Sequence, residues 1–249
     1  MRLSIVMPVY NEGEIIPETV KRIHEQVKTP FELLIVYDME GDTTVDAVKK
    51  IRNKYKSAKL VKNIYGRGAL NAIKTGFTKA KGDAVCVMMA DLTDDPQTLN
   101  EMMRKFDAGF DIVSGSRYMP GGKQIGGPFL KQLMSKTAGI SLHFLAGIPT
   151  WDPTNSFRLY SSRFLKKAKI ESNGGFELGI ELTVKAYFGG YKVTEVPTTW
   201  DYLSKESRFL LKKWLPKYLK WYLWALEKRL QGYPISSLRE TSSLKKSVK

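Results

Sequence analysis

Hydrophobic and polar positions along the first 115 residues fall into two alternating kinds of segment. The first kind is a short apolar run typical of a buried strand, at residues 3–9, 31–37, 59–61, 85–90 and 110–114. The second kind has apolar residues every three or four positions, which predicts helices over 16–27, 45–51, 69–77 and 96–106. This alternation predicts an α/β fold with a mainly parallel sheet, helices on both faces and right-handed crossovers.

The regular alternation of strand and helix segments ends after Ser114. A glycine-rich stretch at residues 119–128 is long and flexible enough to act as a substrate lid. The pattern then predicts helices over 130–144 and 178–188 and strands over 157–160 and 191–198. We expect residues 1–203 to form one domain and the Ser- and Lys-rich residues 233–249 to be a disordered basic tail.

Residues 204–232 lie between the domain and the tail, and their pattern predicts a basic, aromatic, amphipathic helix. Six leucines fall on one face, at positions 211, 215, 219, 223, 226 and 230. The opposite face carries Lys217, Lys220, Trp221, Trp224 and Lys228. We expect the leucine face to dock on the protein and the Trp and Lys face to meet lipid headgroups. A packing or dimer helix with solvated lysines is the alternative.

Charge is unevenly distributed along this chain of net charge +15. Residues 205–249 hold 12 Lys or Arg against 3 Glu, so 12 − 3 = +9 lies in the last 45 residues. Because the basic and aromatic residues are concentrated in this segment, an anionic membrane surface is favoured over nucleic acid as its binding partner. No apolar stretch reaches the roughly 18 residues of a spanning helix, and the first strand leaves no room for a signal peptide. With a single cysteine, Cys86, these features predict a cytoplasmic protein that is peripheral on the cytosolic face of a membrane.

Acidic residues directly follow two of the predicted strands. Asp38 comes after the strand at 31–37, and Asp91, Asp94 and Asp95 come after the run at 85–90. Open α/β sheets bind ligands at the carboxyl ends of their strands. We therefore expect a site for a cation, a nucleotide ribose or both at this edge.

Five motifs, in order along the chain, carry a resemblance to a known family. They are Met7 to Glu12 at the end of the first strand, Asp38, Asp91, Gly115 to Tyr118, and Asp152 to Tyr160. With them the chain resembles the family-two glycosyltransferases, which have the GT-A fold, over residues 3 to about 215. More narrowly, it is similar to the dolichol-phosphate or polyprenyl-phosphate mannosyltransferases and glucosyltransferases.

The resemblance implies a GT-A, Rossmann-like sheet with a nucleotide-sugar site at its edge. The residues implied in donor binding are Pro8, Tyr10, Asn11, Glu12, Asp38, Gly66, Arg67 and Asp91. An aromatic ring can stack on a base, and carboxylates accept hydrogen bonds from base or ribose. Turn chemistry is the alternative for Tyr10 and Glu12, and helix capping is the alternative for Asp38. Asp91 and Arg117 are the expected catalytic residues.

A divalent cation, Mg²⁺ or Mn²⁺, is implied on Asp91, where it would stabilise the charge that grows on the leaving diphosphate. The family motif Asp-Ala-Asp reads Met89-Ala90-Asp91 here, so one carboxylate is missing. A thioether is too soft a ligand to replace it. Metal binding could be weak, could recruit Asp94 or Asp95, or could be replaced by cations such as Arg117. We favour helix capping for Asp94 and Asp95.

The resemblance also implies a binding site for the acceptor. In the related lipid-phosphate enzymes, basic residues from the corresponding segments bind the acceptor phosphate. The residues expected to grip an acceptor phosphate are Arg117, Lys131, Lys205 and Arg208. Asp152 and Glu177 are expected to orient the sugar or nearby loops. A phosphomonoester with a second pKa of about 6 is mostly dianionic at neutral pH. Such a nucleophile needs no dedicated general base.

These inferences predict an inverting enzyme that moves a hexose from a nucleotide diphosphate sugar, of GDP-mannose or UDP-glucose type, to a polyprenyl or dolichyl phosphate. The expected partners are the donor, the lipid, a membrane surface, and a second copy of the chain or a membrane protein. Nucleic acid is not expected. One alternative uses a sugar or polysaccharide acceptor, which requires a general base from the region of Glu177. The other is a degenerate sugar-nucleotide binder without catalysis, motivated by Met89.

Overall fold

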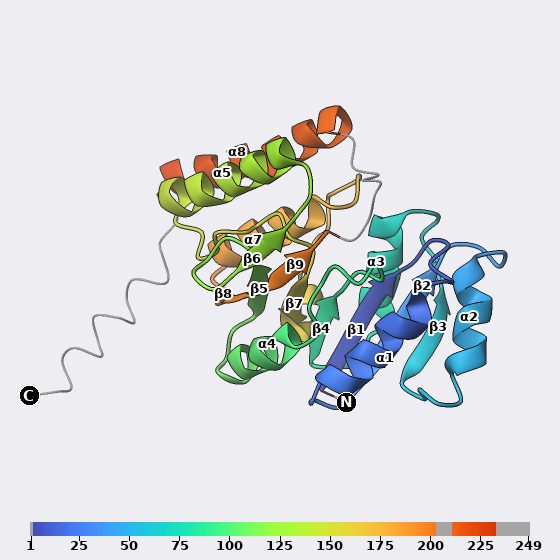
Figure 1. Cartoon of the computed structure of the whole chain (residues 1–249). Coiled ribbons are helices and arrows are strands. Elements are labelled where there is room, and N and C mark those ends of the chain that lie inside the picture. Colours follow the sequence, from blue (N-terminus) through green and yellow to red (C-terminus); the bar gives the residue numbers. More distant parts are fainter. Residues whose placement is uncertain (1, 203–210, 233–249) are drawn as a thin grey trace, which may run out of the picture.

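The computed structural model describes residues 2–202 and 211–232 and shows an α/β domain (Figure 1). The main sheet formed by these residues has seven strands in the order β3-β2-β1-β4-β7-β5-β8. Its strands are β1 Leu3–Pro8, β2 Phe31–Tyr37, β3 Ala58–Lys62, β4 Ala84–Val87, β5 Ile112–Ser116, β7 Arg158–Ser161 and β8 Val193–Pro197. The helices are α1 Ile16–Gln26, α2 Thr43–Ile51, α3 Ala69–Lys79, α4 Thr98–Asp107, α5 Phe129–Ala146, α6 Ser162–Leu165, α7 Leu178–Phe188 and α8 Leu211–Leu230. The expected tail, residues 233–249, lies outside the described residues.

The sheet is mainly parallel, as the sequence predicted. Every residue of β1 is buried, and Leu3 lies opposite Phe31 of β2 on one side and Ala84 of β4 on the other. β7 runs antiparallel between β4 and β5. Because two antiparallel pairings restore the direction, β5 is parallel to β4. The carboxyl ends of β1, β2, β4 and β5 therefore share one edge.

Apolar side chains cover both faces of the sheet. On one face, Val20 of α1, Val48 of α2 and Met102 of α4 join the core made by the strands. On the other face, Ile73 of α3 and Leu182 of α7 pack with the strands, and α5 and α8 extend this layer (Figure 1). The predicted arrangement of helices on both faces is confirmed.

The glycine-rich stretch contains a short strand that the sequence pattern did not indicate. This strand, β6 Lys123–Ile125, pairs in parallel with β9 Thr199–Asp201. Gly122 precedes β6 where a Cβ atom would lie 2.3 Å from the Ser116 carbonyl oxygen, so the close approach of the two backbones needs glycine. The strand expected over 191–198 ends at Pro197, and β9 begins two residues later.

The expected amphipathic helix α8 is present, but its orientation is opposite to the prediction. Trp221 and Ala225 are buried, whereas Leu215, Leu219 and Leu223 are exposed. An indole ring buries more apolar area than a leucine side chain, and the Lys185 amine of α7 lies 4.6 Å from the Trp221 ring centre. The expectation that the leucine face docks on the protein is therefore wrong. Leu215, Leu219, Leu223 and Leu230 face outward, whereas Leu226 packs against the core.

Candidate active site at the carboxyl edge of the sheet

The turn after β1 places the first expected donor residues at this edge, directly beyond Pro8. Asn11 has a positive φ of 56°, which asparagine tolerates better than most residues. Its N–H donates to Asp42 Oδ1 over 3.1 Å, and its Oδ1 accepts from the Thr43 N–H over 3.3 Å. Tyr10 has 47% of its surface exposed, so its ring is accessible at the edge.

Asp38, directly after β2, organises the loop at Gly66 to Gly68. Its Oδ1 accepts from Asn63 Nδ2 over 2.8 Å, and its Oδ2 accepts from the Gly68 N–H over 2.8 Å. Gly68 has φ 114° at the start of α3, a conformation that favours glycine. A helix that begins after such a loop presents N–H groups to an anion. Asp38 does not cap α2, because the side chain at the α2 N-cap is that of Asp42.

Asp91 lies at the end of the apolar run that contains β4. Its Oδ1 accepts two hydrogen bonds from Thr93, one from Oγ1 over 2.6 Å and one from the N–H over 3.2 Å. These bonds close a tight turn in which Leu92 has φ 62°. Because β4, β1 and β2 are adjacent and parallel, Asp91 shares its sheet edge with Asp38.

Asp94 supports the Asp91 loop from inside the protein. Its side chain is buried, and its Oδ2 accepts from the Met89 N–H over 3.1 Å. Burial, followed by repulsion from Asp91, raises the pKa of Asp94 to about 7. The sheet edge therefore pairs a half-buried carboxylate with a buried carboxyl group that titrates near neutrality.

The expectation that Asp94 caps a helix is wrong. Helix α4 begins at Thr98 rather than at Pro96, and its N-cap is Gln97. Asp95 closes the preceding turn, because its Oδ1 accepts from the Gln97 N–H over 3.1 Å. Asp94 satisfies the Met89 amide, a part-buried donor that would otherwise be unpaired.

The residues at this edge fit a divalent cation through a reduced set of ligands. Asp91 Oδ2 accepts no hydrogen bond from the described part of the chain, and the Thr93 hydroxyl lies beside this carboxylate. Within residues 2–202 and 211–232, no cluster of three or more His, Cys, Asp or Glu side chains is suited to a metal. Asp91 alone would hold the cation, with donor diphosphate oxygens as the other ligands, because the Met89 thioether is too soft.

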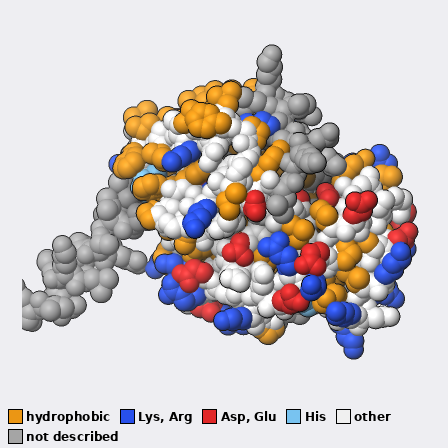
Figure 2. Space-filling model, in the orientation of Figure 1, with side chains coloured by type: hydrophobic (Ala, Val, Ile, Leu, Met, Phe, Trp, Pro, Cys, Tyr) orange, Lys and Arg blue, Asp and Glu red, His pale blue; other side chains and the backbone are white. Residues whose placement is uncertain are grey.

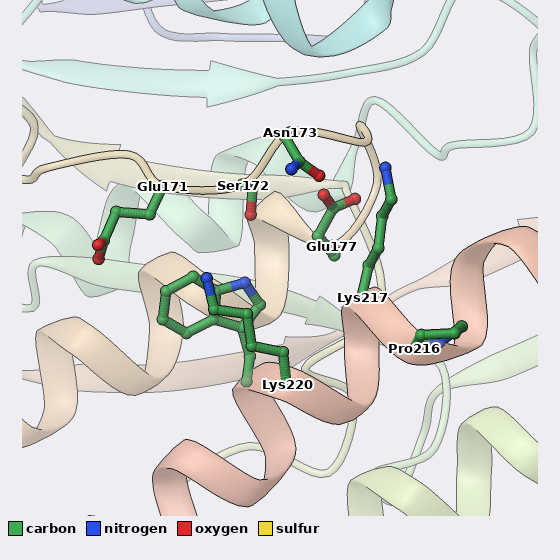
Figure 3. Close-up of a pocket in the computed structure, with 8 residues that line it drawn as sticks. Glu171, Ser172, Asn173, Glu177, Pro216, Lys217 and Lys220 are labelled. Atoms are coloured by element: carbon green, nitrogen blue, oxygen red, sulfur yellow. The ribbon is translucent and has the colours of Figure 1, made fainter.

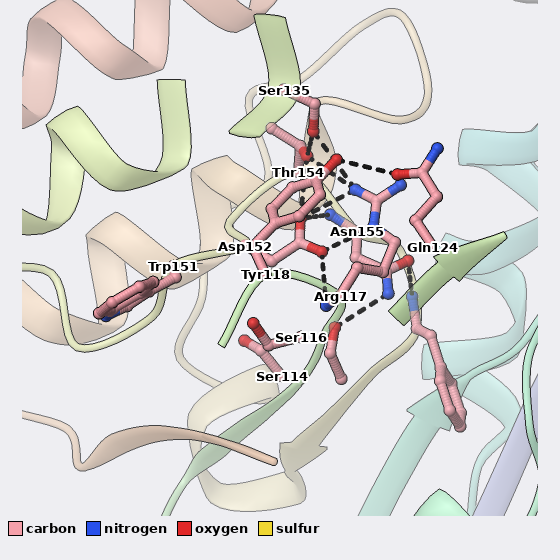
Figure 4. A network of polar contacts seen from close by, with 12 residues as sticks. Ser114, Ser116, Arg117, Tyr118, Gln124, Ser135, Trp151, Asp152, Thr154 and Asn155 are labelled. Atoms are coloured by element: carbon pink, nitrogen blue, oxygen red, sulfur yellow. Dashed lines mark hydrogen bonds and ion pairs between the residues drawn. The ribbon is translucent and has the colours of Figure 1, made fainter. Parts of the chain in front are cut away.

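Arg117, directly after β5, forms a buried ion pair with Asp152 (Figure 4). Its Nε and Nη2 donate to the two carboxylate oxygens over 2.7 and 2.9 Å, and its backbone N–H adds a bond of 3.1 Å. Burial by itself lowers the pKa of Arg117, but Asp152 reverses this and raises it above its ordinary value. Asp152 keeps a lowered pKa, since Arg117 outweighs its burial. In the described structure, Arg117 Nη1 makes no hydrogen bond, so it is the guanidinium nitrogen available to a ligand.

Two hydroxyl groups that were not predicted as site residues complete this network, Thr154 from within the Asp152 to Tyr160 motif and Ser135 from outside every motif. Arg117 Nη2 lies 3.3 Å from Ser135 Oγ and 3.2 Å from Thr154 Oγ1, and the two hydroxyl oxygens are 2.6 Å apart. Ser135 belongs to α5, where a lone serine reads as an ordinary surface residue. The fold alone brings it to Arg117.

β9 connects the Asp91 loop to Arg117. The Asp201 N–H donates to the Thr93 carbonyl over 3.1 Å, and Trp200 forms an isolated bridge with Asp94. The Arg117 guanidinium carbon lies 5.7 Å from the Trp200 ring centre. A single short strand thus contacts both halves of the candidate site.

Arg158 of β7 is a second buried cation that was not predicted as a site residue. It is fully buried; its Nε donates to Ser114 Oγ over 2.8 Å, and its Nη2 donates to the Asp152 carbonyl over 2.9 Å. Its charge also lowers the pKa of the Asp152 carboxyl, although less than Arg117 does. Arg158 therefore supports the Arg117–Asp152 pair from the sheet.

Glu177 orients a loop just before α7. Its two oxygens accept from the N–H groups of Gly174 and Gly175 over 2.6 and 2.8 Å, and the residue is 1% exposed. A Cβ atom at position 174 would lie 2.5 Å from the Trp214 ring, so glycine lets this loop pack against α8. The loop-orienting role has this structural support, and contact with a sugar stays a prediction.

The remaining acceptor residues are only partly placed. Lys131 lies in the first turn of α5, four positions before Ser135 and therefore on the same side of the helix. Lys205 and Arg208 lie outside the described residues. The structure brings together the donor-side residues at one sheet edge: Pro8, Tyr10, Asn11, Glu12, Asp38, Gly66, Arg67 and Asp91.

Comparisons with solved structures agree on the fold. The chain is similar to glucosyl-3-phosphoglycerate synthase from Mycobacterium tuberculosis, crystallised with Mn²⁺, UDP and glucosyl-3-phosphoglycerate. The TM-score is 0.65 at 17% identity, covering 94% of this chain and 81% of the other. Staphylococcus aureus TarS in complex with UDP is also similar, with a TM-score of 0.59 at 20% identity over 81% of this chain and 61% of the other. At these identities the likeness concerns the fold.

Sequence comparisons identify the family. Residues 4–168 match the model for glycosyl transferase family 2. The chain is 30% identical over 225 residues to a dolichol-phosphate mannosyltransferase of Pyrococcus furiosus, covering 88% of this chain and 62% of that relative. It is 31% identical over 209 residues to a polyprenol monophosphomannose synthase of Mycolicibacterium smegmatis, covering 80% and 77%. The resemblance read from the sequence motifs is confirmed, and the chain belongs to glycosyltransferase family 2.

Proposed function

We propose that this protein transfers a hexose from a nucleotide diphosphate sugar to a polyprenyl phosphate, with inversion at the anomeric carbon. The observation that carries the proposal is the position of β9. Its backbone contacts Thr93 beside Asp91, and its Trp200 ring lies against Arg117. Donor-side carboxylates and an acceptor-side cation therefore adjoin one another. The names of the Pyrococcus and Mycolicibacterium relatives support the same substrates.

The donor would bind across the ends of β1, β2 and β4. Tyr10 is exposed to stack on the base, and the N–H groups at the start of α3 suit a diphosphate. Arg67 stands in that loop as a cation for the same phosphates. A divalent cation, when bound to Asp91, would supply positive charge to the leaving diphosphate. Mn²⁺ in the structural relative supports a metal of this kind.

The acceptor phosphate would be both anchor and nucleophile. A phosphate oxygen forms the new bond to the anomeric carbon as the bond from that carbon to the diphosphate breaks, and in-line attack inverts the configuration. The acceptor is mostly dianionic at neutral pH, since its second pKa is about 6. Arg117 Nη1, Lys131 and the Ser135 hydroxyl would orient it, and the hydrogen bond between Arg117 and Ser135 supports this role.

A sugar acceptor is less well supported, because a hydroxyl nucleophile requires a general base. The sequence offered only the Glu177 region for that role. Both Glu177 oxygens accept hydrogen bonds from backbone N–H groups, and the side chain is almost fully buried. This geometry favours an acceptor that is already ionised.

Access to a lipid acceptor would come from an apolar surface on α5 and α8. Figure 2 shows hydrophobic side chains gathered over these two helices. The exposed residues on them include Phe129, Leu130, Leu133, Phe144, Leu215, Leu219 and Leu223. We propose that this α5–α8 surface enters the headgroup region on the cytosolic face of a membrane, with lysines beside it. None of the helices within residues 2–202 and 211–232 has the length and apolarity to cross a bilayer.

An assay of nucleotide release tests the proposal directly. GDP-mannose, UDP-glucose and UDP-N-acetylhexosamines would each be supplied with and without a short, dispersed polyprenyl phosphate. One donor should give release that depends on the lipid phosphate, and the free polyprenol should not replace it. Release that depends on a sugar acceptor, or no release with any donor, would point to the two alternatives.

Ser135 gives this assay a matched pair of variants. Ser135→Ala should raise the acceptor KM about 10-fold and leave the donor KM unchanged, since a lost bond to a charged group costs roughly 1.5–3 kcal/mol. Thr137→Ala, an exposed neighbour on the same helix, is the control and should change neither constant. A rise in donor KM alone would assign Ser135 to the diphosphate instead.

A further inference from the structure

A small cavity lies between α8 and the loop at residues 171–177 (Figure 3). Its volume is about 260 Å³, and its lining includes Ser172, Asn173, Lys217, Lys220 and Trp221. Nothing in the proposed donor or acceptor chemistry uses these five side chains. The cavity is large enough for a phosphate group and its immediate substituents.

The two lysines of the cavity are cations without a carboxylate partner. Within the described ranges, no Asp or Glu oxygen lies within 4.0 Å of the Lys217 or Lys220 amine. Each amine lies instead over an indole ring, Lys217 at 5.4 Å from the Trp214 centre and Lys220 at 4.7 Å from the Trp221 centre. Cation–π contact positions an ammonium group but does not neutralise its charge.

The carboxylates that border the cavity are already engaged. Both oxygens of Glu177 accept from backbone N–H groups, and Glu171 forms an ion pair of 2.5 Å with Lys185. Lys185 also pairs with the buried Glu181 at 2.6 Å. Neither Lys217 nor Lys220 therefore forms an ion pair with these acids in the described structure, although the charge of Lys220 helps to lower the pKa of Glu171.

A buried hydroxyl group in the same cavity lacks a partner. Ser172 Oγ is inaccessible to solvent and makes no hydrogen bond in the described structure. An unsatisfied buried polar group costs free energy, so such groups normally have a partner in the functional state. In Figure 3, the Ser172 hydroxyl points from the loop towards α8.

The cavity lies beside the outward leucine face of α8. Leu215, Leu219 and Leu223 define that face, and successive residues of an α-helix are about 100° apart around the axis. Lys220 therefore projects from the flank of α8, between the outward leucines and the protein body. If the leucines enter a bilayer, this flank lies at the depth of the lipid phosphates.

We propose that this cavity is a binding site for the phosphate of an anionic phospholipid headgroup. Lys217 and Lys220 would supply the charge. The Ser172 hydroxyl, once a change of its side-chain rotamer exposes it to the cavity, would donate a hydrogen bond to a phosphate oxygen. The site uses side chains other than those of the Arg117 network, although Tyr218 of α8 interacts electrostatically with both Glu177 and Arg117. A bound headgroup would fix the rotation of α8 on the membrane. The proposal rests on membrane docking through the α5–α8 surface.

Vesicle sedimentation with the full chain tests the site. Vesicles of phosphatidylcholine, with or without one-fifth phosphatidylglycerol, would be titrated against wild type, Ser172→Ala and Lys217→Gln/Lys220→Gln. We expect the double variant to bind the anionic vesicles at least about 10-fold more weakly. Ser172→Ala should lose about three-fold on anionic vesicles and nothing on neutral ones, because it removes one hydrogen bond without changing charge.

Lys136→Gln/Lys228→Gln is the matched control, since it removes the same charge from α5 and α8 outside the cavity. Equal losses for the two double variants, with Ser172→Ala unchanged, would mean diffuse attraction and overturn the site. A wild-type thermal shift with inorganic phosphate alone that Ser172→Ala abolishes, without any vesicle effect, would also overturn it in favour of a soluble phosphate. Transfer to a short dispersed polyprenyl phosphate should persist in every variant. Loss of that transfer in wild type would count against the proposed function rather than against this cavity.

Discussion

At the scale of single residues, the Asp91 carboxylate is the group on which donor activation depends most. It ends the run that contains β4 and is held by the Thr93 hydroxyl at 2.6 Å. Asp91→Asn should keep the fold, because the amide oxygen can still accept from Thr93, yet should lower turnover at least about 100-fold through the lost charge. Circular dichroism with steady-state kinetics checks both statements. Near-normal turnover in a folded variant would remove Asp91 from the mechanism.

Asp94 makes stability depend on pH in a specific direction. Burial and repulsion from Asp91 raise its pKa from 3.8 to about 7 in the folded protein. The folded state therefore holds a proton that the unfolded state has released, and the contribution of Asp94 to stability is lost as pH rises from about 4 towards 7. Each pKa unit corresponds to about 1.4 kcal/mol. Asp94→Asn should remove this loss and gain on the order of 1 kcal/mol or more at pH 8.

Urea unfolding of wild type and Asp94→Asn between pH 4 and pH 8 measures this difference. The two free energies of unfolding should converge at low pH and separate as pH rises. Asp95→Asn is the control, because Asp95 is a half-buried turn residue whose charge is the smallest of the causes that raise the Asp94 pKa. This variant should keep most of the pH dependence of wild type. A constant offset between wild type and Asp94→Asn would mean that Asp94 does not titrate in this range.

Residue types and strand ends made the donor side predictable from sequence. Tyr10, Asn11, Asp38 and Asp91 follow apolar runs whose carboxyl ends must share an edge if the sheet is parallel. The Ser135 and Thr154 hydroxyls could not be predicted in this way. Ser135 reaches Arg117 from α5 and Thr154 reaches it from the loop before β7, and no local pattern encodes these long-range contacts.

At the scale of elements, α8 shows why amphipathic patterning fixes a helix but not its rotation. The leucine face and the tryptophan face are both apolar enough to be buried, so the pattern permits two orientations. The buried side chain of Trp221 determines the outcome, through packing with α7 and the amine of Lys185. The same pattern also missed β6 and β9, since three-residue strands carry almost no periodic signal.

The orientation of α8 predicts unequal costs for truncating its two faces. Trp221→Ala should destabilise the fold by about 3–5 kcal/mol, as expected for removing a buried aromatic side chain. Leu223→Ala, on the outward face, should change the free energy of unfolding by less than about 0.5 kcal/mol but weaken vesicle binding. Thermal unfolding and sedimentation distinguish the two effects. The reverse ranking would restore the orientation that the sequence first indicated.

At the scale of the whole molecule, three features are connected in series. Strand β9 joins the donor edge of the sheet to the Arg117–Asp152 network, because Trp200 bridges Asp94 and lies near Arg117. Ser135 joins Arg117 to α5, and a hydrogen bond of 2.8 Å between Tyr222 and Ser141 joins α8 to α5. The fold class and the mainly parallel sheet followed from the alternation of strands and helices, whereas the strand order did not. The antiparallel insertion of β7 did not, because a four-residue strand is the same in sequence whichever way it runs.

The most direct test of the proposed function is the structure of the product. Wild-type protein would be incubated with the donor that supports nucleotide release and with a short polyprenyl phosphate, and the lipid fraction would be analysed by mass spectrometry and by the anomeric carbon–proton coupling in NMR. We predict a hexosyl-phosphoryl-polyprenol whose anomeric configuration is opposite to that of the donor. A product with retained configuration, or hexose attached to any acceptor other than the lipid phosphate, would contradict the proposed transfer.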